Sequence, residues 1–376
     1  MKEIEFIRYK NQNLLCNFEN GAVVQVEESE KDQLENYLIK KDSSTKNLLM
    51  ELGFYSLADL RKQAYLHITH RCNLDCIGCY SRISNRNQTK DLSLAEIQRI
   101  LEELNKHSYT DIIISGGEPM IRKDLLEILK MIKEKGFNTV MITNGSISIT
   151  DEILENLDSL AISIDEMDKD KNELGRKYHI EKIIEIQERA KSKNVPVNGI
   201  ITLNHSNIDQ YETYDKWIQK HKLPISYSLF YSNEKGSKDY LVTDDQLQSF
   251  TEKNFKKFSH LLEGFNPFSE VFCKRTCGVA EKTISVDAEG NLCPCHMMHK
   301  SSMGSLLENP ENAWKNLQNF RKTLLEEENE CESCEKKVFC GRGCIARSQG
   351  EGGTKLKDPY CKLYDTYFEK QFELLF

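Results

Sequence analysis

The sequence predicts an α/β fold in three parts: a small N-terminal β/α module, a parallel sheet built from strand and helix units, and a cysteine-rich C-terminal region. Two observations lead to this. Between residues 65 and 230, short apolar segments alternate with amphipathic helical segments, as in a parallel sheet with helices outside. The 13 cysteines are also unevenly placed, with one at position 16, three between positions 72 and 79, and the rest between positions 273 and 361.

Composition and charge exclude several classes of function. The chain has 376 residues, 51 Lys+Arg and 59 Asp+Glu, and its net charge of -8 does not suggest a nucleic-acid partner. No segment approaches the roughly 18 apolar residues of a membrane helix, and the first residues lack the apolar core of a signal peptide. We therefore expect a cytoplasmic protein without a membrane partner, whose cysteines are thiols or metal ligands.

The first 62 residues predict the N-terminal module. Apolar segments separated by polar turns indicate strands at residues 3–9, 14–17 and 22–27. Helices are expected at residues 31–39 and from Ser43 or Ser44 to about residue 52.

The middle of the chain predicts six strands and the helices between them. The strands are expected at residues 65–70, 111–115, 139–143, 160–164, 197–203 and 225–230. The clearest helices are expected at residues 93–104, 124–135, 180–191 and 209–221. In a barrel of such units, functional residues lie at the carboxyl ends of the strands.

A cysteine loop follows the first strand. Cys72, Cys76 and Cys79 have the spacing C-x3-C-x2-C, which lets three thiolates converge on one centre. An iron–sulfur cluster usually takes four cysteines, so three would leave one iron open, as in catalytic metal sites. The alternative is three buried or zinc-bound cysteines.

Polar motifs follow the next three strands. The second strand leads into Ser115-Gly116-Gly117-Glu118-Pro119, where paired glycines permit a close backbone approach. The third leads into Thr143-Asn144-Gly145, which by itself is an ordinary turn. The fourth ends at Ser163-Ile164-Asp165, whose carboxylate suits a ribose diol, and Arg176 follows with a guanidinium that suits a carboxylate.

With Tyr80 directly after the third cysteine, these motifs resemble the radical S-adenosylmethionine (radical SAM) enzymes. The resemblance implies a partial (β/α)6 barrel at residues 63–265, in which Cys72, Cys76 and Cys79 hold a [4Fe-4S] cluster. The open iron of that cluster would chelate the amino and carboxylate groups of SAM. The resemblance also implies a set of SAM-binding residues. Tyr80 would lie beside the adenine, Asp165 would suit the ribose and Arg176 the carboxylate, and the amino group would be bound by Gly116, Gly117, Glu118 and Pro119. Thr143, Asn144 and Ser163 complete the set. Glu166 replaces the glycine usual in the family, so the loop there should differ.

The C-terminal region, residues 266–376, resembles the SPASM extension of peptide-modifying radical SAM enzymes. In that extension, cysteines at this spacing hold two auxiliary [4Fe-4S] clusters. The resemblance assigns the first cluster to Cys273, Cys277, Cys295 and Cys344, and the second to Cys331, Cys334, Cys340 and Cys361. Cys293 is then surplus, although it could replace Cys273. From the residues alone, a pair of zinc knuckles is the alternative.

These resemblances imply a radical SAM peptide maturase. It would cleave SAM reductively to a 5′-deoxyadenosyl radical and oxidatively modify a short ribosomal precursor peptide, forming a thioether or carbon–carbon cross-link. An external electron donor of the flavodoxin or ferredoxin type would reduce it. The N-terminal module resembles the leader-binding module of such enzymes, which takes up a peptide by strand addition. A packing role is the alternative.

Three other functions stay open. Sulfatase-maturase relatives form formylglycine with an aspartate directly after the cysteine that is here Cys295, whereas this chain has His296. Peptide epimerisation needs a thiol hydrogen donor, for which Cys293 and Cys16 are candidates. An iron–sulfur electron carrier is the non-enzymatic alternative. We expect His67 and His70 to be packing residues and Trp314 to pack a helix between the clusters. Because the cysteines are sufficient as ligands, we do not expect His296 or His299 to bind metal.

Overall fold

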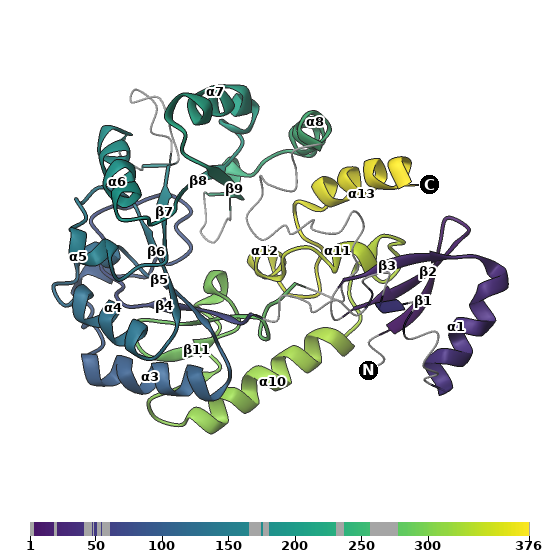
Figure 1. Ribbon diagram of the computed structural model, residues 1–376, viewed down its shortest axis with the longest axis horizontal. Coiled ribbons are helices and arrows are strands. Elements are labelled where there is room, and N and C mark those ends of the chain that lie inside the picture. The colour runs from purple at the N-terminus through teal and green to yellow at the C-terminus, as the bar shows by residue number, and fades with distance from the viewer. Residues whose placement is uncertain are drawn as a thin grey trace.

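Among the residues that the structure describes, one sheet of nine strands runs from the barrel into the cysteine-rich region (Figure 1). The computed structural model describes residues 4–18, 21–40, 47, 49–50, 54, 61–164, 174–175, 180–230, 237–255 and 277–375. In the sheet the strand order is β12-β11-β10-β4-β5-β6-β7-β8-β9. The six strands from β4 to β9 are parallel to one another, which confirms the predicted α/β class and the parallel sheet.

The parallel strands have these bounds: β4 (Gln63–His67), β5 (Asp111–Ser115), β6 (Asn138–Thr143), β7 (Ser159–Ser163), β8 (Val197–Leu203) and β9 (Ile225–Leu229). Predicted and observed strands coincide within a residue or two, except β4, for which the predicted end at His70 is wrong. After His67 the backbone leaves the ladder, because the carbonyls of Thr69 and Arg71 accept hydrogen bonds from Gly117 and Glu118. These hydrogen bonds from the loop after β5 therefore replace the regular β4–β5 pairing beyond His67.

Amphipathic helices cover the parallel strands on the outside (Figure 1). They are α3 (Leu94–Lys106), α4 (Leu125–Glu134), α5 (Asp151–Leu154), α6 (Ile180–Ser192), α7 (Tyr211–His221) and α8 (Asp244–Asn254). The sequence explains where α3 begins: the Ser93 hydroxyl accepts from the Glu96 backbone N–H, and the Glu96 carboxylate accepts from the Ser93 N–H. Short 3-10 helices lie in the loops, at η1 (Arg86–Gln88), η2 (Pro119–Ile121), η3 (Ile208–Gln210), η4 (Lys238–Tyr240) and η6 (His296–Met298).

Strand β4 has two buried faces, and they serve different purposes. Ala64 and Leu66 belong to the large apolar core that packs against the helices. Because strand side chains alternate, Tyr65 and His67 lie on the opposite face, where they contact aromatic rings of the candidate site. Both residues are buried, so this face is a closed wall of the site.

The cysteine-rich region joins the barrel by extending its sheet. Strand β10 (Thr283–Val286) pairs in parallel with β4, and β11 (Asn291–Cys293) and β12 (Gly304–Ser305) continue antiparallel from it. Four helices follow, namely α10 (Pro310–Glu326), α11 (Lys337–Cys340), α12 (Ile345–Glu351) and α13 (Cys361–Leu375). Trp314 of α10 is buried, which confirms its predicted packing role, and it stacks on His107 at 3.8 Å and packs near Tyr109, so the helix packs here on the barrel.

The N-terminal module is an antiparallel sheet of β1 (Ile4–Tyr9), β2 (Gln12–Asn17) and β3 (Val23–Val26), followed by α1 (Glu28–Lys40). Much of the helix predicted from Ser43 or Ser44 onward lies outside the described residues. The Tyr9 ring packs on Phe339 at 5.2 Å and on Phe372 at 4.5 Å. The module is thereby anchored to α11 and α13, as its place beside them in Figure 1 indicates.

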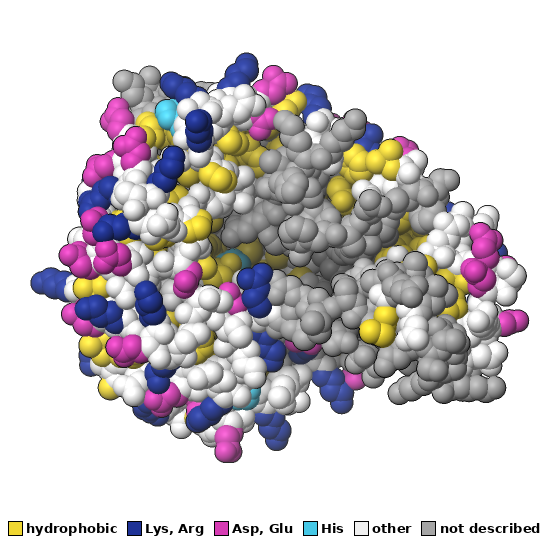
Figure 2. All heavy atoms as spheres, in the orientation of Figure 1, with side chains coloured by type: hydrophobic (Ala, Val, Ile, Leu, Met, Phe, Trp, Pro, Cys, Tyr) yellow, Lys and Arg dark blue, Asp and Glu magenta, His cyan; other side chains and the backbone are white. Residues whose placement is uncertain are grey.

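Charges of both signs are interspersed on the face drawn in Figure 2, where Lys and Arg alternate with Asp and Glu over the barrel. Within the described ranges, no helix is both long enough and apolar enough to cross a membrane.

Candidate active site

The cysteine loop occupies the carboxyl end of β4. The thiol of Cys72 accepts a hydrogen bond from the backbone N–H of Leu74 at 3.4 Å, and Cys76 is buried. The Cys79 sulfur lies 3.4 Å from the Ser81 hydroxyl. Burial raises the pKa of Cys72, and the neighbouring Cys79 thiol contributes in the same direction. The loop thus gathers sulfur atoms at the strand end where the sequence predicted them.

The glycine pair after β5 is required by the cysteine loop itself. Gly117 N–H donates to the Thr69 carbonyl at 2.7 Å, and Glu118 N–H donates to the Arg71 carbonyl at 2.9 Å. A Cβ atom at Gly116 would lie 2.3 Å from the Thr69 oxygen, and one at Gly117 would lie 1.9 Å from the Arg71 oxygen. The close approach expected from the two glycines is therefore made to the backbone that carries the cysteines.

Glu118 connects the loops that follow β5 and β6. Its side chain is almost fully buried, and its carboxylate accepts hydrogen bonds from the Thr143 hydroxyl at 2.7 Å and the Asn144 N–H at 2.8 Å. It also accepts from the Met120 N–H at 3.0 Å, which caps the short helix η2 that Pro119 begins. These bonds fix Glu118 and orient the Thr-Asn-Gly turn.

Asn144 extends the connection to the cysteine loop. Its Nδ2 donates to the Asn73 side-chain oxygen at 2.9 Å, and Asn73 in turn donates to the Ser146 hydroxyl at 2.8 Å. Asn73 is the residue directly after Cys72. The loops after β4, β5 and β6 therefore meet in one hydrogen-bonded network.

The motif after β7 is described only in part. Ser163 is the last residue of β7 and is half-buried, whereas Asp165, Glu166 and Arg176 lie outside the described residues. Leu174 O accepts from Ile77 N–H at 2.8 Å, so the chain immediately before Arg176 touches the cysteine loop.

Aromatic rings from two regions of the chain close the site. The Tyr80 hydroxyl lies 2.9 Å from the Ser115 hydroxyl, which fixes the ring beside the end of β5. His296, from the cysteine-rich region, stacks on Tyr65 at 4.0 Å and meets the Tyr80 ring edge-on at 5.2 Å. His67 meets Tyr80 from β4 at 6.0 Å. Burial lowers the pKa of His296 to about 4 and that of His67 well below its usual range.

The expected ligands of the first auxiliary cluster lie together where they are described. Burial raises the pKa of the Cys295 thiol, and the neighbouring Cys344 and Cys277 raise it further. Cys344 precedes α12, and its N–H donates to the Asp358 carboxylate at 2.6 Å. Asp358 is buried and pairs with Arg347, which is largely shielded from solvent, at 2.7 Å. Cys273 lies outside the described residues.

The four expected ligands of the second auxiliary cluster form another group. Burial raises the pKa of Cys331, and Cys361 and Cys334 add to the effect. Burial, followed by the nearby Cys340, raises the pKa of Cys361 to about 11. Cys340 is the last residue of α11, and Cys361 is the first residue of α13.

Cys293 has different surroundings. It ends β11 and is fully buried, and its Sγ donates to the His299 carbonyl at 3.4 Å. Burial and then Asp287 raise its pKa.

The cysteine groups suit iron–sulfur clusters chemically, because cysteine thiolates are the usual ligands of such clusters and each cysteine binds its own iron. A buried donor beside the cysteine loop supports the fit: Arg86 Nη2 has no hydrogen-bond partner among the described residues.

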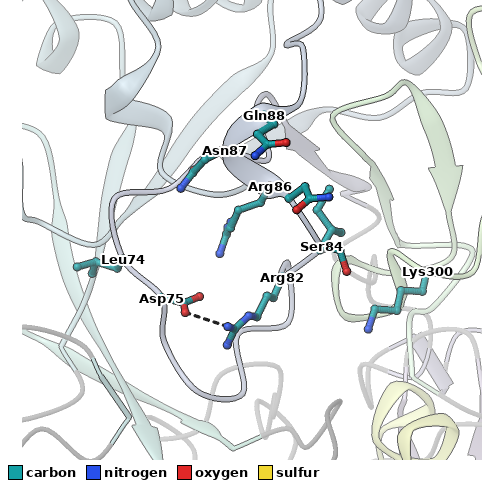
Figure 3. A pocket seen from close by; sticks show the side chains of 10 residues that line it. Leu74, Asp75, Arg82, Ser84, Arg86, Asn87, Gln88 and Lys300 are labelled. Atoms are coloured by element: carbon teal, nitrogen blue, oxygen red, sulfur yellow. Dashed lines mark hydrogen bonds and ion pairs between the residues drawn. The ribbon is translucent and has the colours of Figure 1, made fainter.

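A cavity of about 730 Å³ opens beside the cysteine loop (Figure 3). Leu74 and Asp75 line it on one side, residues 82–88 on another, and Lys300 of the cysteine-rich region completes it. Arg82 and Asp75 form an ion pair across it at 2.9 Å.

Sequence reasoning did not single out Arg86 or Asn87, although Asn87 accepts a hydrogen bond from the Cys72 N–H at 2.9 Å. Neither belongs to a spaced motif, so the sequence carried no signal for them. The sequence places His296 directly after Cys295, but its contact with Tyr80 depends on the pairing of β10 with β4. Its position directly after Cys295 was the available clue.

Comparison with known proteins identifies two domains. Residues 66–218 match the Radical SAM superfamily, and residues 277–335 match the iron-sulfur cluster-binding domain SPASM. An AdoMet-dependent heme synthase from Methanosarcina barkeri is 24% identical over 339 residues, which are 78% of this chain and 94% of that protein. The sporulation killing factor maturation protein SkfB from Bacillus subtilis is 28% identical over 220 residues, which are 55% of this chain and 53% of that protein.

Two solved structures share the fold. Streptococcus suis SuiB bound to precursor peptide SuiA has a TM-score of 0.62 at 15% identity, and the match covers 96% of this chain and 98% of that one. The structure of anSMEcpe with bound AdoMet has a TM-score of 0.66 at 15% identity, and the match covers 84% of this chain and 94% of that one.

Proposed function

Because this chain contains a radical SAM domain followed by a SPASM domain, which imply iron–sulfur clusters and SAM binding, we propose that it is a radical SAM peptide maturase. Its reaction would be the oxidative modification of a ribosomal precursor peptide, with a thioether or carbon–carbon cross-link as the product. The observation that carries the proposal is the hydrogen-bonded network that joins the cysteine loop, Glu118 and Asn144 at one sheet edge.

The residues of this network have separate roles. Cys72, Cys76 and Cys79 would hold the cluster, and Gly116 to Pro119 would present backbone carbonyls to the SAM amino group. Glu118 would keep Thr143 and Asn144 in place, since its carboxylate already accepts bonds from both. When bound, the cluster and SAM would supply the 5′-deoxyadenosyl radical, and the buried faces of Tyr65 and His67 would exclude water from it.

The two SPASM cysteine groups support an oxidation. Four thiolates saturate a four-iron cluster and leave no open iron, so such clusters carry electrons. We assign Cys277, Cys295 and Cys344 to one cluster together with Cys273, and Cys331, Cys334, Cys340 and Cys361 to the other. His296 connects the two halves, because it touches both the Tyr80 ring and the Cys295 sulfur, the latter at 3.6 Å.

A peptide substrate is supported by the N-terminal sheet and by two relatives. Strand β3 pairs with β2 on one side, and no strand in the described ranges pairs with its other edge. An extended peptide can add to such an edge through main-chain hydrogen bonds. SuiB was solved with a precursor peptide, and SkfB is a maturation protein. Domain limits near residues 62 and 265 would separate a peptide-binding module, the barrel and the cluster domain.

A second candidate is a porphyrin substrate. The heme synthase relative matches over nearly its whole length, and an Fe-coproporphyrin III synthase from the same organism is 27% identical over 187 residues, which are 48% of this chain and 46% of that protein. Mass spectrometry distinguishes the peptide candidate from the porphyrin candidate, because only the true substrate should change mass. A cross-linked peptide loses two hydrogens, whereas Fe-coproporphyrin III incubated with SAM and dithionite should keep its mass if the peptide assignment holds.

Iron and sulfide content provides the primary test. Anaerobically reconstituted protein should contain about twelve irons, and the variant with Cys72, Cys76 and Cys79 all replaced by alanine about eight. The wild type should form 5′-deoxyadenosine from SAM with dithionite, and the variant should not. About four irons, all lost in the variant, would remove the auxiliary clusters from the proposal. Twelve irons without 5′-deoxyadenosine would indicate an electron carrier instead.

A further inference from the structure

A short segment after the cysteine loop clamps that loop from the outside. Helix η1 (Arg86–Gln88) begins after Asn85, whose left-handed backbone (φ 56°) turns the chain back toward the cysteines. Asn87 accepts from the Cys72 N–H at 2.9 Å, and the Thr89 hydroxyl donates to the Arg86 carbonyl at 2.8 Å. The clamp thereby holds the Arg86 side chain against the loop.

The guanidinium of Arg86 points at sulfur. Its Nε donates to the His70 carbonyl at 2.8 Å, and its Nη1 donates to the Cys79 sulfur at 3.8 Å. The residue is only 7% exposed, and Figure 3 shows the side chain reaching toward the centre of the cavity. Nη2 is buried and has no hydrogen-bond partner within the described ranges.

If Arg86 only anchored the loop, this would explain its Nε hydrogen bond to the His70 carbonyl but not the position of the other two guanidinium nitrogens. A buried N–H without an acceptor is unfavourable, so Nη2 calls for a partner that the chain does not provide. A permanently charged guanidinium held against the cysteine loop also attracts negative charge to that position. The arrangement is therefore suited to an anionic, sulfur-rich group held by the cysteines.

We propose that Arg86 is a positioning residue for the SAM-binding cluster, which donates N–H···S hydrogen bonds to its sulfur atoms and raises its reduction potential. The inference rests on the proposed function. Reduction adds negative charge to the cluster, and a fixed cation at the cluster stabilises the more negative state. The sulfur of the cluster provides the acceptor that Nη2 lacks. Arg86 thus makes the cluster easier for a one-electron donor to reduce.

The test measures the reduction potential of the SAM-binding cluster in the full-length holoprotein by potentiometric electron paramagnetic resonance. The signal of this cluster is recognised because it changes when SAM is added. Arg86→Gln should lower this potential by at least about 59 mV, a tenfold change in the ratio of reduced to oxidised cluster for one electron. Arg86→Lys retains the charge and should restore part of the shift. An unchanged potential in Arg86→Gln overturns the inference.

Arg122→Gln is the matched control. Arg122 is equally buried and donates to the carbonyls of Ile68 and Leu92 and to Asp124, so in the described part of the chain it bonds oxygen atoms. Its removal should lower thermal stability and leave the potential unchanged. An equal shift in both variants would mean a general loosening of the loop and would also overturn the inference.

If Arg86→Gln does not retain the cluster, Arg86→Lys provides the second measurement. Lysine keeps the charge but cannot reproduce the N–H···S bonds of the guanidinium fork, so its cluster potential should lie below that of the wild type. A potential equal to or above the wild-type value contradicts the inference. A wild-type protein without any SAM-responsive signal would instead refute the proposed function. The two failures are therefore distinguishable.

Discussion

The carboxylate of Glu118 accepts a hydrogen bond from the Thr143 hydroxyl at 2.7 Å, and this bond ties the end of β5 to the end of β6. Two neighbouring loops are thus held by one buried side chain. The sequence placed both residues at strand ends, but it could not show that they bond each other. The relationship makes Glu118 a structural part of the site as well as a candidate SAM contact.

We therefore expect Glu118→Gln to weaken both stability and SAM binding. The amide would place a donor opposite the Thr143 hydroxyl or the Asn144 N–H, which leaves a buried group unsatisfied at a cost of about 1–3 kcal/mol. Thermal unfolding and equilibrium dialysis of SAM measure the two effects. The exposed Glu127 of α4 provides the control, since Glu127→Gln should change the free energy of unfolding by less than about 0.5 kcal/mol. Equal effects in the two variants would contradict the role of Glu118.

Gly117→Ala should disrupt the cysteine loop selectively. The new Cβ would lie 1.9 Å from the Arg71 carbonyl oxygen, a backbone atom that can move only if the loop moves. We expect the variant to lose about four of about twelve irons while the auxiliary clusters remain. Gly353→Ala is the control, because a Cβ there meets no described atom within 4 Å, and it should retain all its iron. A fully loaded Gly117→Ala protein would show that the loop tolerates the displacement.

Local patterns were sufficient to predict most of the barrel. The strands β5 and β8 have the predicted bounds because their apolar segments end at polar or turn residues. The pairing of β10 with β4 was not predictable, since it joins Thr283 to Gln63 across most of the chain. This pairing brings His296 to Tyr80. Arg86 was missed for a related reason: its partner, Cys79, is recognised only once the loop is folded.

His67 should make stability depend on pH. Its pKa in the folded protein is well below 6.5, because burial disfavours the charged ring and the neighbouring His299 and His296 add to the effect. The unfolded chain therefore binds a proton first as the pH falls through about 6.5, and the folded state loses stability below that value. Between about pH 7 and about pH 5.5 the contribution is about 1 kcal/mol.

The variant His67→Gln isolates this contribution. Urea unfolding of the apoproteins at the two pH values should show that the wild type loses about 1 kcal/mol more than the variant. The other titrating groups are common to both proteins and cancel in the difference. Identical losses would mean that the folded protein accepts a proton on His67 without penalty.

Asp358→Asn should destabilise the first auxiliary cysteine group. The carboxylate is buried, pairs with Arg347, and accepts from the Cys344 N–H at 2.6 Å. Removing one partner of a buried ion pair typically costs about 3–5 kcal/mol. We expect a lower unfolding midpoint and the loss of about four irons. On α13, Asp365→Asn breaks a partly exposed ion pair with Lys336 and should cost less than about 1 kcal/mol. Full iron content in Asp358→Asn would show that the cluster assembles without this ion pair.

Tyr9 should prove to be the anchor of the N-terminal sheet. Its ring packs between Phe339 and Phe372, and its hydroxyl is buried without a partner among the described residues. Tyr9→Ala removes the ring and should cost about 3–5 kcal/mol, whereas Tyr9→Phe keeps the ring, deletes only an unsatisfied hydroxyl and should be neutral or stabilising. Limited proteolysis near residue 61 and chemical unfolding would report both effects. If Tyr9→Ala leaves the cleavage rate unchanged, the sheet is held by other contacts. If Tyr9→Phe is as unstable as Tyr9→Ala, the attachment of the N-terminal sheet depends on the Tyr9 hydroxyl and not on its ring.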